Sequence, residues 1–233
     1  MNVRKGGELM DMSPILISMK TATLSIFLTF FLGIGFAQLV ISLKRQSVKI
    51  LLDGLFTLPL VLPPTVVGFF LLYMFGIKRP IGKFFLEYFG IKIAFSWGAT
   101  VLAAVVISFP LMYRSARGAF EQVEPTILEA ARTLGMSEWN IFWKIQLPLS
   151  LPGLISGGIL AFARGLGEFG ATAMIAGNMI GKTRTLPLAI YSKVAAGHME
   201  EAYGYVGIII VLSFFIVALM NITSWMDKKK GGN

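Results

Sequence analysis

The chain has 233 residues, of which 55% are hydrophobic and 14% are charged, and its mean hydropathy is +0.74. Soluble domains carry roughly 25% charged residues, so this composition indicates an integral membrane protein. The net charge of +9 does not indicate nucleic-acid binding, because the basic residues are spread over the ends of apolar segments instead of gathering on one face. The absence of cysteine excludes disulfides and thiolate chemistry, and the single histidine, His198, argues against a histidine-based metal site. We therefore expect no metal and no cofactor.

Five apolar segments are long enough to cross a membrane. The hydrocarbon core of a bilayer is about 30 Å thick and needs about 20 helical residues. The predicted spans are residues 21–43, 50–76, 93–113, 149–177 and 204–225. We therefore expect an all-α integral membrane protein, a single transmembrane domain over residues 1–233, with its termini on opposite sides of the membrane.

The second span contains prolines at its centre, with Pro63, Pro64 and Thr65 in sequence after Pro59. Proline removes a backbone donor and must kink or break the helix. Within lipid, the freed carbonyls are tolerated only where protein or a water-filled cavity satisfies them. The sequence therefore predicts that Pro63, Pro64 and Thr65 line a translocation pathway. The alternative is a packing kink without a role in transport.

Residues 124–148, between the third and fourth spans, are polar and amphipathic. Pro125 suits the first turn of a helix, and Gly135 suits its left-handed end. Ser137 can cap a second short helix, which we expect Pro148 to end. The pattern predicts a helix–Gly–helix motif that is apolar on one side and charged on the other.

The fourth span carries small residues at successive steps of four. They are Gly153, Gly157, Ala161 and Gly165. Such a stripe lets another helix approach closely, which is how helices associate within a membrane. We expect these residues to serve helix packing and to offer a contact surface to a second copy of the chain.

Arg164 and Glu168 lie one helical turn apart near the middle of the same predicted span. Charged side chains within a span are costly and usually face protein or a wet cavity. At this spacing the two side chains share a helix face and can pair. They are either a polar element of a pathway for an anion or a structural ion pair between helices.

The segments that follow the fourth span are less informative. Residues 186–196 form an apolar helical pattern that is too short to cross the membrane. The Lys and Arg residues of the loops divide equally between the two sides, so the positive-inside rule does not orient the chain. No nucleophile–base set or carboxylate pair suggests catalysis, and we expect that the chain is not an enzyme.

The helix–Gly–helix segment resembles the EAA signature of the membrane subunits of bacterial ABC importers. The matching residues are Glu129, Ala130, Ala131, Gly135, Ile145, Leu147 and Pro148. The resemblance implies a type I ABC-importer permease fold whose residues 124–148 form a cytoplasmic coupling loop that docks on an ATPase subunit. It also implies that the N-terminus lies outside and the C-terminus in the cytoplasm. The alternative is an amphipathic helix pair lying on the membrane surface.

Further segments are similar to the molybdate permease group within that family, which belongs to bacterial or archaeal cell membranes. They are residues 58–68, 95–97, 108–112 and 161–172. The resemblance implies a homodimer of this chain, two cytoplasmic ATPase subunits, an extracytoplasmic oxyanion-binding protein and no nucleic acid. The sulfate and thiosulfate permeases share the Arg-x-x-Gly-Glu pattern, so sulfate, thiosulfate or tungstate is the alternative substrate. A secondary transporter or channel acting alone would also place broken helices and charge in the lipid bilayer.

Overall fold

The computed structural model describes residues 2–5 and 8–230 of the chain, and side chains within residues 11–222. Its helices are α1 (Ser13–Ser42), α2 (Gln46–Val61), α3 (Pro64–Phe75), α4 (Pro80–Phe89), α5 (Trp97–Glu121), α6 (Pro125–Thr133), α7 (Glu138–Ile141), the π-helix η1 (Phe142–Gln146), α8 (Leu147–Leu166), α9 (Gly170–Ala176), α10 (Leu186–Ala195) and α11 (Met199–Lys230). A short antiparallel hairpin, β1 (Asn2–Lys5) and β2 (Glu8–Asp11), precedes them. The membrane domain is all-α, as predicted.

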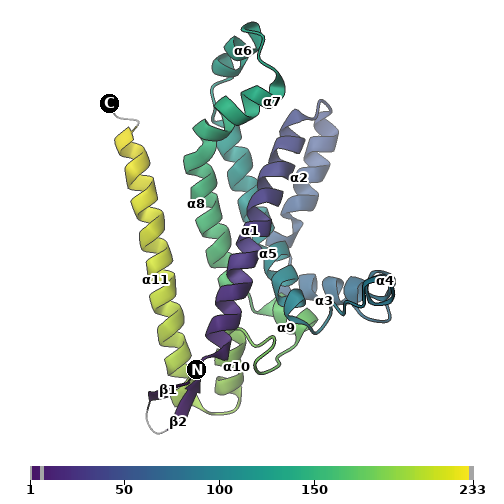
Figure 1. The fold of residues 1–233 in the computed structure, drawn as a ribbon, viewed down its shortest axis with the longest axis vertical. Coiled ribbons are helices and arrows are strands. Elements are labelled where there is room, and N and C mark those ends of the chain that lie inside the picture. The colour runs from purple at the N-terminus through teal and green to yellow at the C-terminus, as the bar shows by residue number, and fades with distance from the viewer. Residues whose placement is uncertain (1, 6–7, 231–233) are drawn as a thin grey trace.

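The long helices run roughly side by side along the longest axis of the molecule (Figure 1). Among the described residues, four helical segments are long and apolar enough to span a membrane: Ser13–Ser42, Trp97–Glu121, Glu138–Leu166 and Met199–Ile222. The pair α2 and α3 makes a fifth candidate, with a bend of 111° between its halves. Helices α6 and α7 lie at one end of the molecule together with the end of α11, and α1 begins at the opposite end (Figure 1).

The predicted second span, 50–76, is broken at its prolines, which is one of the two outcomes that the sequence predicted. The chain breaks at Leu62 and Pro63, which have extended ψ angles of 142° and 134°. Each of them precedes a proline, and a proline ring disfavours the helical conformation of the residue before it. Pro59, by contrast, stays inside α2.

The predicted fourth span, 149–177, is wrong as one helix, because α8 ends at Leu166 and α9 starts at Gly170. Glycine costs about 1 kcal/mol relative to alanine inside a helix, and both Gly167 and Gly170 fall at this break. The side chain of Glu168 accepts a hydrogen bond from the Ala171 amide over 2.7 Å and so satisfies the start of α9.

Pro148 does not end the second helix of the loop, contrary to the prediction. The chain stays helical from α7 through η1 into α8, with a Leu147 amide bonded to the Phe142 carbonyl. This wider turn accommodates Pro148, because proline lacks an N–H and its ring would clash with the carbonyl of an ordinary helical turn.

The remaining boundaries extend the predicted elements or add to them. Helices α1 and α11 begin earlier than the predicted first and last spans, and α5 is shifted towards the C-terminus, with the Ser96 side chain capping its first turn. The short apolar pattern at 186–196 is confirmed as α10, whereas α4 lies between the predicted second and third spans, where no helix was predicted. Helix formation continues past the apolar residues because backbone hydrogen bonding does not require an apolar side chain.

The core lies where α1, α5 and α8 pack together. Its buried members include Val40, Met112, Tyr113 and Leu154. Hydroxyl pairs also cross this interface: Thr21 with Thr100 at 3.0 Å, and Thr29 with Ser108 at 3.2 Å. Small side chains and interhelical hydrogen bonds replace hydrophobic drive inside a membrane, so this trio forms the rigid frame of the fold.

Candidate functional site

Helix α6 ends at Gly135 in the left-handed conformation that the sequence predicted. Gly135 has a φ of +76°. The Gly135 amide donates to the Arg132 carbonyl over 2.9 Å, and the Met136 amide donates to the Ala131 carbonyl over 3.1 Å. These two bonds form a complete Schellman motif, which turns the chain sharply between α6 and α7.

An exposed ion pair links the two short helices. Arg132 on α6 pairs with Glu138 on α7, with Nε–Oε1 at 2.7 Å and Nη2–Oε2 at 3.2 Å. The hydrogen bond to Glu138 raises the pKa of Arg132, so the guanidinium stays charged. The Asn140 amide donates to Ser137 Oγ over 3.4 Å, as the predicted cap requires. Glu138 was not among the predicted site residues, although its opposite charge across Gly135 was a usable signal.

The loop exposes large apolar side chains at the end of the molecule. Leu134 is 82% exposed, Trp139 is 71% exposed and Trp143 is 49% exposed. Of the predicted coupling residues, Glu129, Ala130 and Pro148 are exposed, Ile145 and Leu147 are half-buried, and Ala131 is buried. Exposed apolar patches of this kind mark interaction surfaces. We call Leu134, Trp139 and Trp143 the apolar face of the loop.

The two helix breaks meet in space, which the sequence did not predict. A Cβ placed on Gly170 would lie 3.0 Å from Pro64 Cβ and 3.2 Å from the Thr65 nitrogen. A Cβ on Gly68 would lie 2.7 Å from Ala171 Cα, so α3 and α9 are in backbone contact. We call this meeting point of the two breaks the break junction.

Arg164 and Glu168 form the expected pair, with Nη1 and Oε2 2.9 Å apart. They lie at the end of α8 and in the break, not in the middle of a continuous helix. The Glu168 side chain is 2% exposed and both of its oxygens are bonded, one to Arg164 and one to the Ala171 amide. The Arg164 side chain is 32% exposed. Glu168 therefore anchors the break, while the Arg164 side chain stays partly exposed.

The small-residue stripe packs inside the chain. A Cβ on Gly153 would lie 2.7 Å from Ala119 Cβ, and one on Gly157 would overlap Ser115, both on α5. Gly165 faces Ser25 of α1, and Ala161 is buried in the core. The expectation that the stripe offers a contact surface to a second copy is wrong, because α5 already covers it.

A polar network between α2 and α5 was missed. Asp53 of α2 pairs with Arg117, and Tyr113 donates its hydroxyl to the same carboxylate. Arg117 also contacts Glu121 over 2.7 Å. A lone carboxylate within an apolar run was the signal that could have found it. Among the described residues, no group of three or more His, Asp or Glu side chains could hold a metal ion.

Comparisons with known proteins identify the family. The family model described as "Binding-protein-dependent transport system inner membrane component" matches residues 16–231. The chain is 44% identical over 218 residues to the molybdenum transport system permease protein ModB of Escherichia coli K12, covering 94% of each chain. It is 42% identical over 205 residues to the putative molybdenum transport system permease protein YvgM of Bacillus subtilis, covering 88% of this chain and 90% of the relative.

Solved structures share the fold. A chain of the inward-facing MetNI methionine ABC transporter matches with a TM-score of 0.69 and 17% identity, over 91% of this chain and 93% of that one. A chain of a bacterial ABC transporter that imports alginate matches with a TM-score of 0.69 and 13% identity, over 94% of this chain and 79% of that one. The chain therefore belongs to the inner membrane components of binding-protein-dependent transport systems, the multi-pass permease subunits of ABC importers, which are transport components rather than enzymes.

Proposed function

We propose that this chain is the permease subunit of a molybdate importer. The support is its identity of 42–44% to permeases named for molybdenum transport, together with the Arg-x-x-Gly-Glu segment that carries Arg164 and Glu168. Tungstate, sulfate or thiosulfate is the competing substrate class. A transporter acting alone is set aside, because the family is that of binding-protein-dependent transport systems and the solved structures that share the fold come from ABC transporters.

We infer that substrate passes the break junction, and the meeting of the two helix breaks is the observation that carries this inference. Broken helices within a membrane are tolerated where they are buried in protein or line a wet cavity. Pro63 and Thr65 are exposed and Pro64 is half-buried in the single chain. Arg164, which pairs with Glu168 in the second of the two breaks, has a side chain that is 32% exposed, and its positive charge suits an oxyanion.

The coupling loop docks on the ATPase in this proposal. The two short helices α6 and α7 lie at the end of the molecule where α11 finishes (Figure 1), and the apolar face of the loop is exposed there. That end is then cytoplasmic, and the end where α1 begins is outside. We propose Glu129, Ala130 and Ala131, with Gly135, Ile145, Leu147 and Pro148, as the residues that transmit the ATPase cycle.

We propose a homodimer served by two ATPase subunits. In the single chain, α2 contains no buried residue, although it forms half of a broken span. Since lipid-exposed helix breaks are costly, a second copy facing α2 and α3 would enclose the pathway between the two chains.

The test is uptake by the chain reconstituted with its ATPase and binding protein. Arg164→Gln keeps a hydrogen-bond donor for Glu168 but removes the charge, and Arg164→Lys is the matched control that keeps the charge. We expect Arg164→Gln to assemble and hydrolyse ATP but to import molybdate about tenfold more slowly, a barrier increase of about 1.4 kcal/mol. Uptake near that of the unmodified protein would make Arg164 a structural residue. Equal competition by sulfate would remove the molybdate assignment.

A further inference from the structure

Helix α4 is an amphipathic helix that the rest of the chain leaves largely uncovered. Of its described residues only Gly82 is buried, and Phe84, Tyr88 and Phe89 are 49%, 75% and 61% exposed. Lys83 and Glu87 lie one turn apart on its other side, 3.5 Å from each other. Figure 1 shows α4 projecting sideways from the bundle, at the level of α3 and α9. Its aromatic side therefore needs a cover that the chain does not supply.

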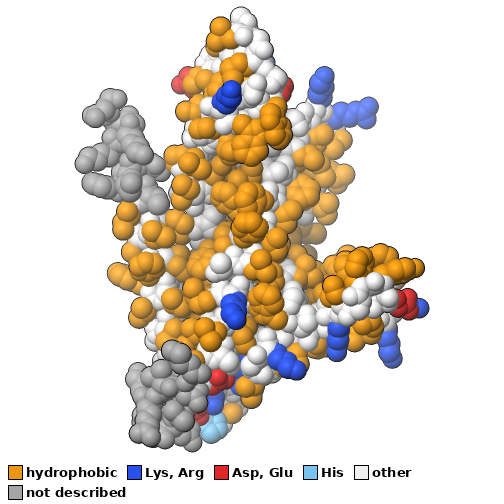
Figure 2. All heavy atoms as spheres, viewed as in Figure 1, with side chains coloured by type: hydrophobic (Ala, Val, Ile, Leu, Met, Phe, Trp, Pro, Cys, Tyr) orange, Lys and Arg blue, Asp and Glu red, His pale blue; other side chains and the backbone are white. Residues whose placement is uncertain are grey.

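The two sides of α4 are oriented relative to the spans. In Figure 2, hydrophobic side chains cover the upper side of α4, towards the end of the molecule that carries α6 and α7. Charged side chains lie on its lower side. A helix with this arrangement lies in the plane of a membrane interface, with its apolar side in the acyl region and its charges in water. The geometry therefore places α4 at a membrane surface.

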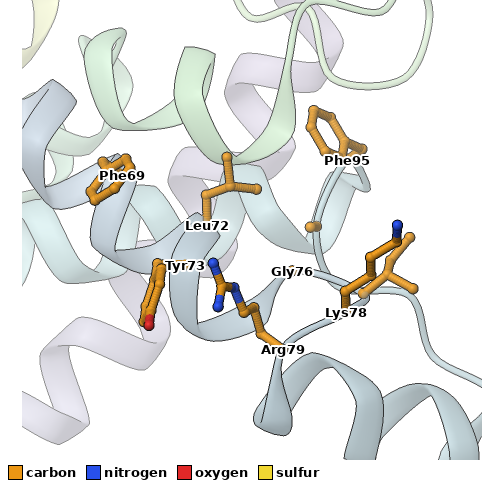
Figure 3. A pocket seen from close by; sticks show the side chains of 9 residues that line it. Phe69, Leu72, Tyr73, Gly76, Lys78, Arg79 and Phe95 are labelled. Carbon is orange, nitrogen blue, oxygen red and sulfur yellow. The ribbon is translucent and has the colours of Figure 1, made fainter.

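A cavity of about 470 Å³ lies between the end of α3, the turn into α4 and the segment before α5 (Figure 3). Its walls are mostly apolar, with Phe69 and Leu72 on one side and Ala94 and Phe95 on the other. Phe95 has a φ of 58°, and its amide donates to the Ile175 carbonyl over 2.9 Å. That conformation is rare for a bulky residue and persists only where its surroundings hold it, here through the hydrogen bond to Ile175.

Basic side chains stand at this apolar cavity. Lys78 and Arg79 line it, and the Arg79 guanidinium lies 4.0 Å from the centre of the Tyr73 ring (Figure 3). Within the described part of the chain no carboxylate pairs with either of them, whereas Lys83 on α4 is paired with Glu87. An apolar cavity with unpaired cations at its edge is complementary to an anion that carries a hydrocarbon chain.

We propose that the turn between α3 and α4 binds an anionic phospholipid, whose acyl chain enters the cavity and whose negative charge is attracted by Lys78 and Arg79, which extend to opposite sides of the turn (Figure 3). The aromatic side of α4 then rests in the same leaflet, beside that lipid. A second copy of the chain would cover the apolar wall but would not explain the unpaired cations. A bilayer lipid supplies both the hydrocarbon and the negative charge. The proposal does not depend on which oxyanion is carried.

The experiment measures lipid binding to the purified, assembled transporter by native mass spectrometry. Phosphatidylglycerol and phosphatidylcholine of the same acyl length are titrated onto delipidated complexes. The double variant Lys78→Gln/Arg79→Gln removes both cations, and Lys83→Gln is the matched control on the other side of α4. We expect the double variant to bind phosphatidylglycerol about thirtyfold more weakly, roughly fivefold for each cation, and the control to bind it normally.

A second variant tests the cavity itself. Ile77 lines it and is 40% exposed, so Ile77→Trp fills the space without disturbing the core. We expect Ile77→Trp complexes to assemble and to lose phosphatidylglycerol binding. Equal binding of the two lipids by the unmodified protein would overturn the proposal, as would full binding by the double variant or by Ile77→Trp. Disulfide crosslinking between two copies through Lys78→Cys would also overturn it, by assigning this face to a contact between chains.

Discussion

Gly135 is the position where a single methyl group should uncouple the permease from its ATPase. Its φ of +76° costs an L-residue roughly 1–2 kcal/mol. A Cβ there would meet no atom within 4 Å, so the whole penalty is conformational and no clash contributes. Since 1.4 kcal/mol is a factor of ten, the fraction of loops with α7 correctly directed should fall about fivefold to thirtyfold relative to other conformations.

The assay is recovery of the ATPase with the purified permease, followed by ATP-driven uptake. We expect recovery of the ATPase to be lowered least by Gly135→Asn, more by Gly135→Ala and most by Gly135→Val. Asparagine tolerates the left-handed region, whereas a β-branched residue does not. Gly118→Ala is the control: Gly118 is helical on α5 and a Cβ there also meets no atom within 4 Å. Normal recovery and uptake by Gly135→Val would refute the reasoning.

Two further predictions follow from the break junction and the helix packing. The chain lacks cysteine, so single cysteines can be labelled selectively. Leu62→Cys and Thr65→Cys should react with a membrane-impermeant thiol reagent in at least one nucleotide state, while the buried control Val67→Cys should not. Failure of both to react would make this stretch a packing feature. Gly157→Ala should lower the thermal unfolding temperature through a destabilisation of about 1–3 kcal/mol, because its Cβ would overlap Ser115. Gly35→Ala is the control, since a Cβ there meets no atom within 4 Å. Equal unfolding temperatures for the two variants would contradict this packing of α8 on α5.

Local features of this protein were determined by the sequence itself. Gly135 was predicted to end the first loop helix because only a residue without Cβ adopts that conformation freely, and its φ confirms this. Arg164 and Glu168 were predicted to pair because helical spacing brings residues four apart together. The approximate membrane spans followed from apolar length alone.

The sequence left one helix interruption undecided and placed another wrongly, because neighbouring residues compete. Pro63 and Pro64 predicted a kink or a break, and the restriction that each proline imposes on the preceding residue makes it a break of 111°. Pro148 signalled an end, yet the π-helical turn before it lets the helix continue. Such outcomes depend on which backbone groups find other partners, which a residue pattern does not state.

Only the tertiary structure decided which elements meet. Nothing in the sequence says that Gly170 lies against Pro64, or that the stripe around Gly157 faces α5 and not a second chain. Asp53 and Arg117 are likewise paired across two helices that are distant along the chain. Periodicity shows which face of a helix is apolar or small, but every apolar face fits many partners. The choice among them is made by close packing over the whole molecule, and that is a property of the folded chain.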